Sequence, residues 1–165
     1  METVEPWLRG THGDVAVVQR AVVHALQLAR EDVLRWCGPL QPDEVERKPY
    51  GLPSVGFQLR HIARSLDRLM TYAEGAQLSA AQLDALQREA AASGDAVEEC
   101  VAAVDHTLER VTRIQPDTLD AMRVVGRDRL PTTVAGLLIH VAEHTQRHVG
   151  QAITTAKLAL ALRDG

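Results

Sequence analysis

Apolar residues recur every three or four positions in four long stretches of the chain, a period typical of helices with one buried face. Capping residues, glycines and prolines mark the ends of these stretches and predict helices over about 14–37, 54–74, 95–115 and 133–161. We expect Asp14 and Ser54 to cap the first two helices, Gly94 or Asp95 to begin the third, and Pro131 and Thr132 to open the fourth.

The segments between these helices are less regular. The sequence LQPDEVERKPYGLPSVG holds three prolines and two glycines, which predicts a structured loop without a long element. The alanine-rich stretch 77–92 has Ser79 as a possible cap and suits a short helix within a crossover. MRVVGRDRL is the one short segment with strand-like composition, and we expect it to form an extended arm before the fourth helix.

Four amphipathic patterns with almost no strand signal predict an all-α fold, namely a four-helix bundle with a long crossover between helices two and three. Such a crossover allows the second and third long helices to run parallel. A length of 165 residues favours a single domain over 1–165 with a substantial core.

Composition excludes several classes of function. The net charge of −4 provides no basic field for phosphates, so we expect no nucleic-acid partner. The chain shows neither a signal peptide in METVEPWLRG nor an apolar run of membrane-spanning length, which predicts a soluble, cytoplasmic protein without a membrane partner. Cys37 and Cys100 are isolated from each other, which fits a reducing compartment and a role as small core residues.

Three of the seven histidines follow one another at four-residue intervals, at His140, His144 and His148. Imidazoles one helical turn apart can bind the same metal ion, whereas those eight residues apart cannot. Relative to the apolar stripe, at about 100° per residue, His148 lies about 40°, His144 about 80° and His140 about 120° from its centre. The inward pair is therefore His144 with His148, and His140 flanks the site or meets solvent.

A divalent ion needs a further ligand, and His61 in the second helix is the best candidate. It lies about 120° from the centre of its helix's stripe, so it reaches the site only if a cleft opens at the seam between helices. We interpret His12, His24 and His106 as ordinary loop, bundle or surface histidines.

The pattern HVAEH also matches the H-x-x-E-H motif of inverted zinc proteases. Those enzymes need a third ligand well downstream, and only 21 residues follow His144. Glu143 also falls almost opposite the apolar stripe, so the sequence does not favour this function.

HTQRHVGQ, with a histidine one turn earlier, and SVGFQLRHIARSLDRL in the second helix together resemble the DinB/YfiT-like superfamily. The resemblance covers nearly the whole chain. It implies a four-helix bundle with a long crossover and a divalent metal bound by His61, His144 and His148. Gly150 and Gln151 complete the similar block and are expected to serve helix packing. The family's members are often dimeric, which implies a homodimer.

Three imidazoles leave a coordination position for water or substrate, as catalytic sites do. Similar proteins include transferases that use low-molecular-weight thiols, so the leading hypothesis is a metal-dependent thiol S-transferase in detoxification or stress response, with a small thiol and an electrophile as partners. We expect zinc or nickel, although iron and manganese also accept imidazole. Arg60 and Arg64 flank His61 and are either partners of an anionic thiol or solvated.

Three alternatives remain open at this point. The chain could be a metal-dependent hydrolase, a stress-associated bundle that binds metal without turnover, or a metal-free bundle whose histidines respond to pH. No carboxylate can be assigned as a general base. Cys37 lies in a different motif from the histidines and is better explained by packing.

Overall fold

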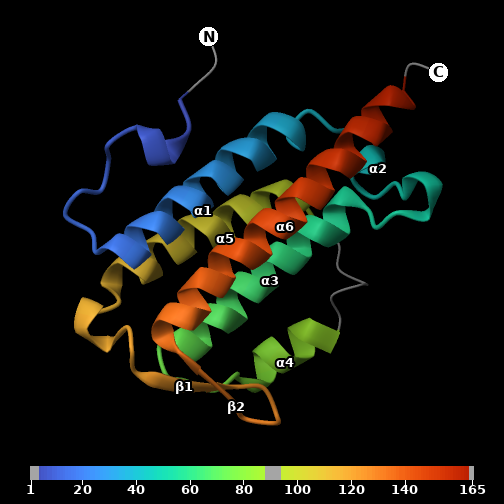
Figure 1. Cartoon of the computed structure of the whole chain (residues 1–165). Helices are drawn as coiled ribbons and strands as arrows, with labels where there is room; N and C mark the ends of the chain where they lie inside the picture. Colours follow the sequence, from blue (N-terminus) through green and yellow to red (C-terminus); the bar gives the residue numbers. More distant parts are fainter. Residues whose placement is uncertain (1–3, 88–93, 164–165) are drawn as a thin grey trace.

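The computed structural model describes residues 4–87 and 94–163 and shows an all-α bundle with one small sheet (Figure 1). The four long helices are α1 (Val17–Trp36), α3 (Val55–Ala73), α5 (Ala96–Arg113) and α6 (Val134–Ala161). The shorter elements are η1 (Pro6–Leu8), α2 (Pro42–Val45), η2 (Pro49–Gly51), α4 (Ala80–Gln87), η4 (Pro116–Thr118), β1 (Met122–Val125) and β2 (Leu130–Thr133).

Each long helix packs against two others. α3 contacts α5 and α6, and α1 contacts the same two helices, so α1 and α3 lie at opposite corners of the bundle. Figure 1 shows α3 and α5 running in one direction and α1 and α6 in the other. The parallel pair is joined by the expected crossover, which contains α4. The last part of the helix expected there, 88–92, lies outside the described residues.

Side chains cap three of the long helices. The Ser54 hydroxyl accepts a hydrogen bond from the backbone of α3, and the Asp95 carboxylate accepts two from the backbone of α5, as the sequence predicts. The expectation for Asp14 is wrong. A turn in which the Val15 amide donates to the His12 carbonyl precedes the helix, so α1 begins only at Val17, without a side-chain cap.

The segment before α6 is a β-hairpin. β1 and β2 pair antiparallel, with Met122 opposite Thr133 and Val125 opposite Leu130. The strand-like composition of this segment therefore predicted its extended structure correctly. The expectation that Pro131 and Thr132 open the last helix is wrong, because both residues belong to β2. Thr133 ends the strand and also caps α6, because its hydroxyl accepts from the Gly136 amide.

The core fills the space between the four helices. Its largest fully buried apolar side chains come from α1, α3 and α6, and are Leu26, Leu59, Ile62, Leu66, Met70 and Leu138. Cys37 and Cys100 are buried free thiols, as expected, and burial raises the pKa of each to about 12. Neither is therefore a ready nucleophile. None of the helices within 4–87 and 94–163 is long and apolar enough to cross a membrane.

Candidate metal centre

Three imidazoles converge at the seam between α3 and α6. His61 comes from α3, and His144 and His148 come from successive turns of α6. Each offers a ligand nitrogen, and these atoms all lie within 4.8 Å of one another. The Nε2 atoms of His61 and His144 are 3.3 Å apart, and the ring of His148 lies 4.5 Å, centroid to centroid, from each of the other two rings. The structure thus brings together the three residues that the sequence singled out.

The position of the cluster follows from how the two helices pack. On α6, Val141, Thr145 and Val149 are buried, which leaves the adjacent histidines half-buried at the edge of the apolar stripe. On α3, Leu59 and Ile62 are fully buried and bracket His61. The seam position expected for His61 is confirmed, and its ring faces the neighbouring helix.

The cluster favours neutral imidazoles. The pKa of His144 is lowered to about 4, chiefly because burial disfavours the charged ring, and then because His148, His61, His140 and Arg147 would repel a second positive charge. A neutral ring keeps a lone pair available to a cation at pH 7.

The donor set fits a divalent metal ion of intermediate softness. It consists of three nitrogens, and no carboxylate or thiol joins the cluster in the part of the chain that the structure describes. Imidazole donors suit zinc, nickel, copper and iron, whereas magnesium and calcium prefer oxygen. Three protein ligands around zinc are the usual number at catalytic sites.

Gln58 orients one of the three rings. Its side chain is buried in α3, and its Oε1 atom lies 2.6 Å from Nδ1 of His148. An amide oxygen only accepts hydrogen bonds, so His148 donates from Nδ1–H and its lone pair is at Nε2. Sequence reasoning missed Gln58. The available signal was its position three residues before His61, on the same face of one helix.

A second neighbour, Phe57, packs on the cluster from α3. Its ring is nearly parallel to that of His61, with an interplanar angle of 11° and centroids 6.0 Å apart. The only phenylalanine of the chain therefore provides an apolar wall beside a proposed ligand.

His140 does not belong to the cluster. Its side chain is 46% exposed, and its Nδ1 atom lies 3.8 Å from an oxygen of Glu143. Glu143 is itself 61% exposed, so the H-x-x-E-H pattern does not place a carboxylate beside the other histidines.

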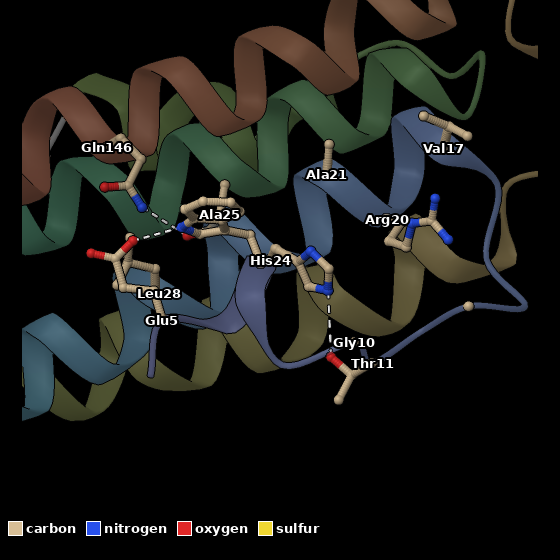
Figure 2. A pocket seen from close by; sticks show the side chains of 12 residues that line it. Glu5, Gly10, Thr11, Val17, Arg20, Ala21, His24, Ala25, Leu28 and Gln146 are labelled. Carbon is tan, nitrogen blue, oxygen red and sulfur yellow. Dashed lines mark hydrogen bonds between the residues drawn. The ribbon is translucent and has the colours of Figure 1, made fainter. Parts of the chain in front are cut away.

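The histidines interpreted as ordinary lie elsewhere. His106 is exposed on α5, and the Nε2 atom of His12 is 2.9 Å from the amide nitrogen of Gln27. His24 lines a cavity of about 710 Å³ on the outer side of α1, where its ring reaches the Thr11 hydroxyl at 3.4 Å (Figure 2). This cavity includes none of the three clustered histidines.

The two arginines beside His61 are engaged in structural contacts. Arg60 is buried and donates to a Glu46 carboxylate oxygen at 2.6 Å and to the Gly94 carbonyl at 3.0 Å. Arg64 lies 3.6 Å from a Glu99 carboxylate oxygen. Neither residue therefore presents an uncommitted cation to the cluster.

A smaller cavity, of about 370 Å³, is connected to the cluster through Gln58, although none of the three histidines lines it. Leu52 and Pro53, from the loop before α3, line one part of it, and Arg147 and Gln151 on α6 line another. Gln58 also lines it, and because this residue bonds His148, the cavity and the cluster share a wall.

This fold and this cluster define a class of protein, a four-helix bundle with three histidines that can hold a metal ion between two of its helices. A family model for the DinB superfamily matches residues 25–152, a range that contains all three histidines. The chain belongs to the DinB superfamily. A comparison with curated proteins gave no match.

Proposed function

We propose that the chain is a divalent-metal-dependent S-transferase that joins a low-molecular-weight thiol to an electrophile, in detoxification or stress response. The observation that carries the proposal is the set of three clustered histidines, which no carboxylate joins among the described residues, in a chain of the DinB superfamily. Zinc and nickel are the metals we expect, with iron and manganese as alternatives.

His61, His144 and His148 would hold the cation. When bound, a divalent cation lowers the pKa of a coordinated thiol and so favours the thiolate. The protein's own groups prepare the site: Gln58 fixes the orientation of the His148 ring, and Phe57 covers one side of His61. In the transfer the thiol loses its proton to solvent, its sulfur forms a bond to the electrophilic carbon, and the leaving group departs with its electron pair.

A hydrolase is the weaker alternative. Hydrolysis benefits from a general base near the attacking water. Within the described residues no carboxylate joins the histidine cluster, and Glu143, the acidic residue nearest to it in sequence, faces solvent beside His140. A transferase needs no such base, because thiols ionise far more readily than water.

Conjugation of monochlorobimane tests the proposal directly. Zinc-loaded and nickel-loaded wild type would be incubated with the dye and several thiols, with His61→Ala as the inactive reference and His106→Ala as a matched surface control. We expect conjugate formation by wild type and His106→Ala well above the rate of His61→Ala. If metal-loaded wild type does not exceed His61→Ala with any thiol, a metal-binding bundle without turnover replaces the transferase. Wild type that stays metal-free under metal-replete conditions would contradict both.

The homodimer and the cytoplasmic location implied at the level of sequence remain predictions. Light scattering of the purified protein measures the first, and fractionation of cells that express the full chain measures the second.

A further inference from the structure

The cavity beside the histidine cluster has an unusual charge for this protein. Among the residues that the structure describes, Arg147 is the one charged residue that lines it, and the other polar lining groups are amides and hydroxyls. The chain as a whole carries a net charge of −4, so a cavity whose described lining has one positive charge and no acidic residue departs from the overall composition. Such a cavity favours an anionic ligand over an amine.

The guanidinium of Arg147 is not committed to a protein partner. No hydrogen bond or ion pair of its side chain occurs within 4–87 and 94–163, although Glu143 lies one turn earlier on α6. By contrast, Arg60 and Arg64 are engaged with Glu46 and Glu99. A free guanidinium offers a planar set of donors that matches the geometry of a carboxylate.

Arg147 is also a neighbour of the cluster along α6. It directly precedes His148 on α6, and Gln58, which accepts a hydrogen bond from His148, lines the same cavity as Arg147. Gln151 follows Arg147 by one turn of α6 and adds an amide to the same wall of the cavity. An anion held by these two side chains would therefore lie beside the histidines.

We propose that this cavity binds the carboxylate of a small organic acid, with Arg147 as its cationic partner, while the reactive end of the same or a second reactant lies at the histidine cluster. The volume of about 370 Å³ suits a small molecule. Leu52 and Pro53 provide an apolar surface for its carbon chain. The proposal rests on the proposed function, because it specifies the chemical class of reactant for that site.

Propionate, which has a carboxylate and no thiol, tests the subsite by itself. In NMR titrations of the zinc-loaded protein we expect propionate to shift the signals of the Arg147 guanidinium and the Gln151 amide. The Gln151 shift should be lost in Arg147→Gln and retained in Arg127→Gln, a control at an exposed arginine in the turn of the hairpin. Absence of these wild-type shifts, or persistence of the Gln151 shift in Arg147→Gln, overturns the subsite, whatever any thiol does.

A pair of thiols then links the subsite to the reaction. 3-Mercaptopropionate and 2-mercaptoethanol share a thiol and differ in carrying a carboxylate or a hydroxyl. We expect zinc-loaded wild type to prefer the former, with the ratio of dissociation constants falling roughly tenfold in Arg147→Gln and less in Arg147→Lys. An unchanged ratio, together with propionate shifts that depend on Arg147, assigns the carboxylate to the electrophile. If propionate binds through Arg147 and neither thiol binds the zinc-loaded protein, the transferase proposal fails and the anion subsite stands.

Discussion

The Nε2 atom of His61 on α3 lies 3.3 Å from the Nε2 atom of His144 on α6, although 83 positions separate the two residues in sequence. Two imidazole nitrogens this close are stabilised when they share a proton or face a common cation, since their lone pairs otherwise repel. The contact therefore identifies the α3–α6 seam as the place where the bundle brings polar ring nitrogens together and could hold a metal ion.

Removing any of the three clustered rings should abolish tight metal binding. We expect His61→Ala, His144→Ala or His148→Ala to weaken zinc binding by more than about 100-fold, because each leaves only two nitrogens. Competition with a chromophoric chelator measures the affinity. His140→Ala, outside the cluster, should bind zinc like wild type. If His61→Ala retained wild-type affinity, α3 would not contribute a ligand.

Removing the acceptor on His148 should weaken metal binding to a smaller extent. We expect Gln58→Leu to lower zinc affinity about 10- to 100-fold, because the ring loses the partner that fixes its orientation, and Gln58→Glu to retain most of it. Nitrogen-15 NMR of the metal-free protein should show the His148 proton on Nδ1.

A second buried glutamine provides the matched control for that experiment. The side-chain amide of Gln19 donates to the carbonyls of Val111 and Ile114 and makes no bond to His61, His144 or His148. Gln19→Leu should reduce the free energy of unfolding without changing zinc affinity. Equal losses of affinity in Gln19→Leu and Gln58→Leu would show that the effect is structural.

Shortening a buried core side chain should destabilise the protein much more than shortening an exposed one. Leu26 on α1 is fully buried, so Leu26→Ala is expected to lower the free energy of unfolding by about 2–5 kcal/mol. Leu83 on α4 is 41% exposed, and Leu83→Ala should cost less than about 1 kcal/mol. Urea unfolding measures both, and similar losses would contradict the burial difference.

The free energy of unfolding should fall at acid pH because the Glu44 carboxylate becomes protonated. This buried carboxylate accepts hydrogen bonds from the Arg163 guanidinium and from the backbone N–H of Gln41, which lower its pKa from an ordinary value near 4.5 to about 2. The unfolded chain therefore binds this proton at a higher pH than the folded chain does. The stabilisation is complete above about pH 4.5 and is lost as the pH falls toward 2.

Two variants check the role of that carboxylate. Glu44→Gln should be less stable than wild type at pH 7 and lose less stability between pH 4.5 and 2, the range bounded by the two pKa values. Asp43→Asn, which alters an exposed pair with Arg47, should change little. Denaturant titrations at several pH values provide the comparison, and parallel profiles for Glu44→Gln and wild type would exclude Glu44 as the titrating group.

Local patterns in the sequence were sufficient to predict the four long helices and to single out His144 and His148 on α6. Helical period and the spacing of His144 and His148 are properties of consecutive residues, so they can be read before the fold is known. The prediction that Asp14 caps the first helix was wrong, because the chain forms a turn closed at Val15 before the helix begins. A turn and a helix start favour the same residue types, so the sequence does not distinguish them.

Contacts between residues far apart in the sequence could not be predicted from local patterns. Gln58 is informative only once α3 is paired with α6 and its amide meets His148. Whether an arginine is available likewise depends on its partners. Arg60 is next to His61 in sequence yet is occupied by Glu46, whereas Arg147 has no such partner among the described residues.

The hairpin also has a consequence for the direction of the imidazoles. β2 continues into α6 without an intervening loop, because Thr133 is both the last strand residue and the helix cap. Strand pairing thus sets the rotational phase with which α6 leaves the sheet. One residue inserted between Thr133 and His144 would turn the later part of the helix by about 100° and aim two rings away from α3. One residue inserted in the loop before α3 would leave the rotation of α6 unchanged. The loop before α3 can therefore vary in length without turning His144 and His148 away from α3, whereas the segment between Thr133 and His144 cannot.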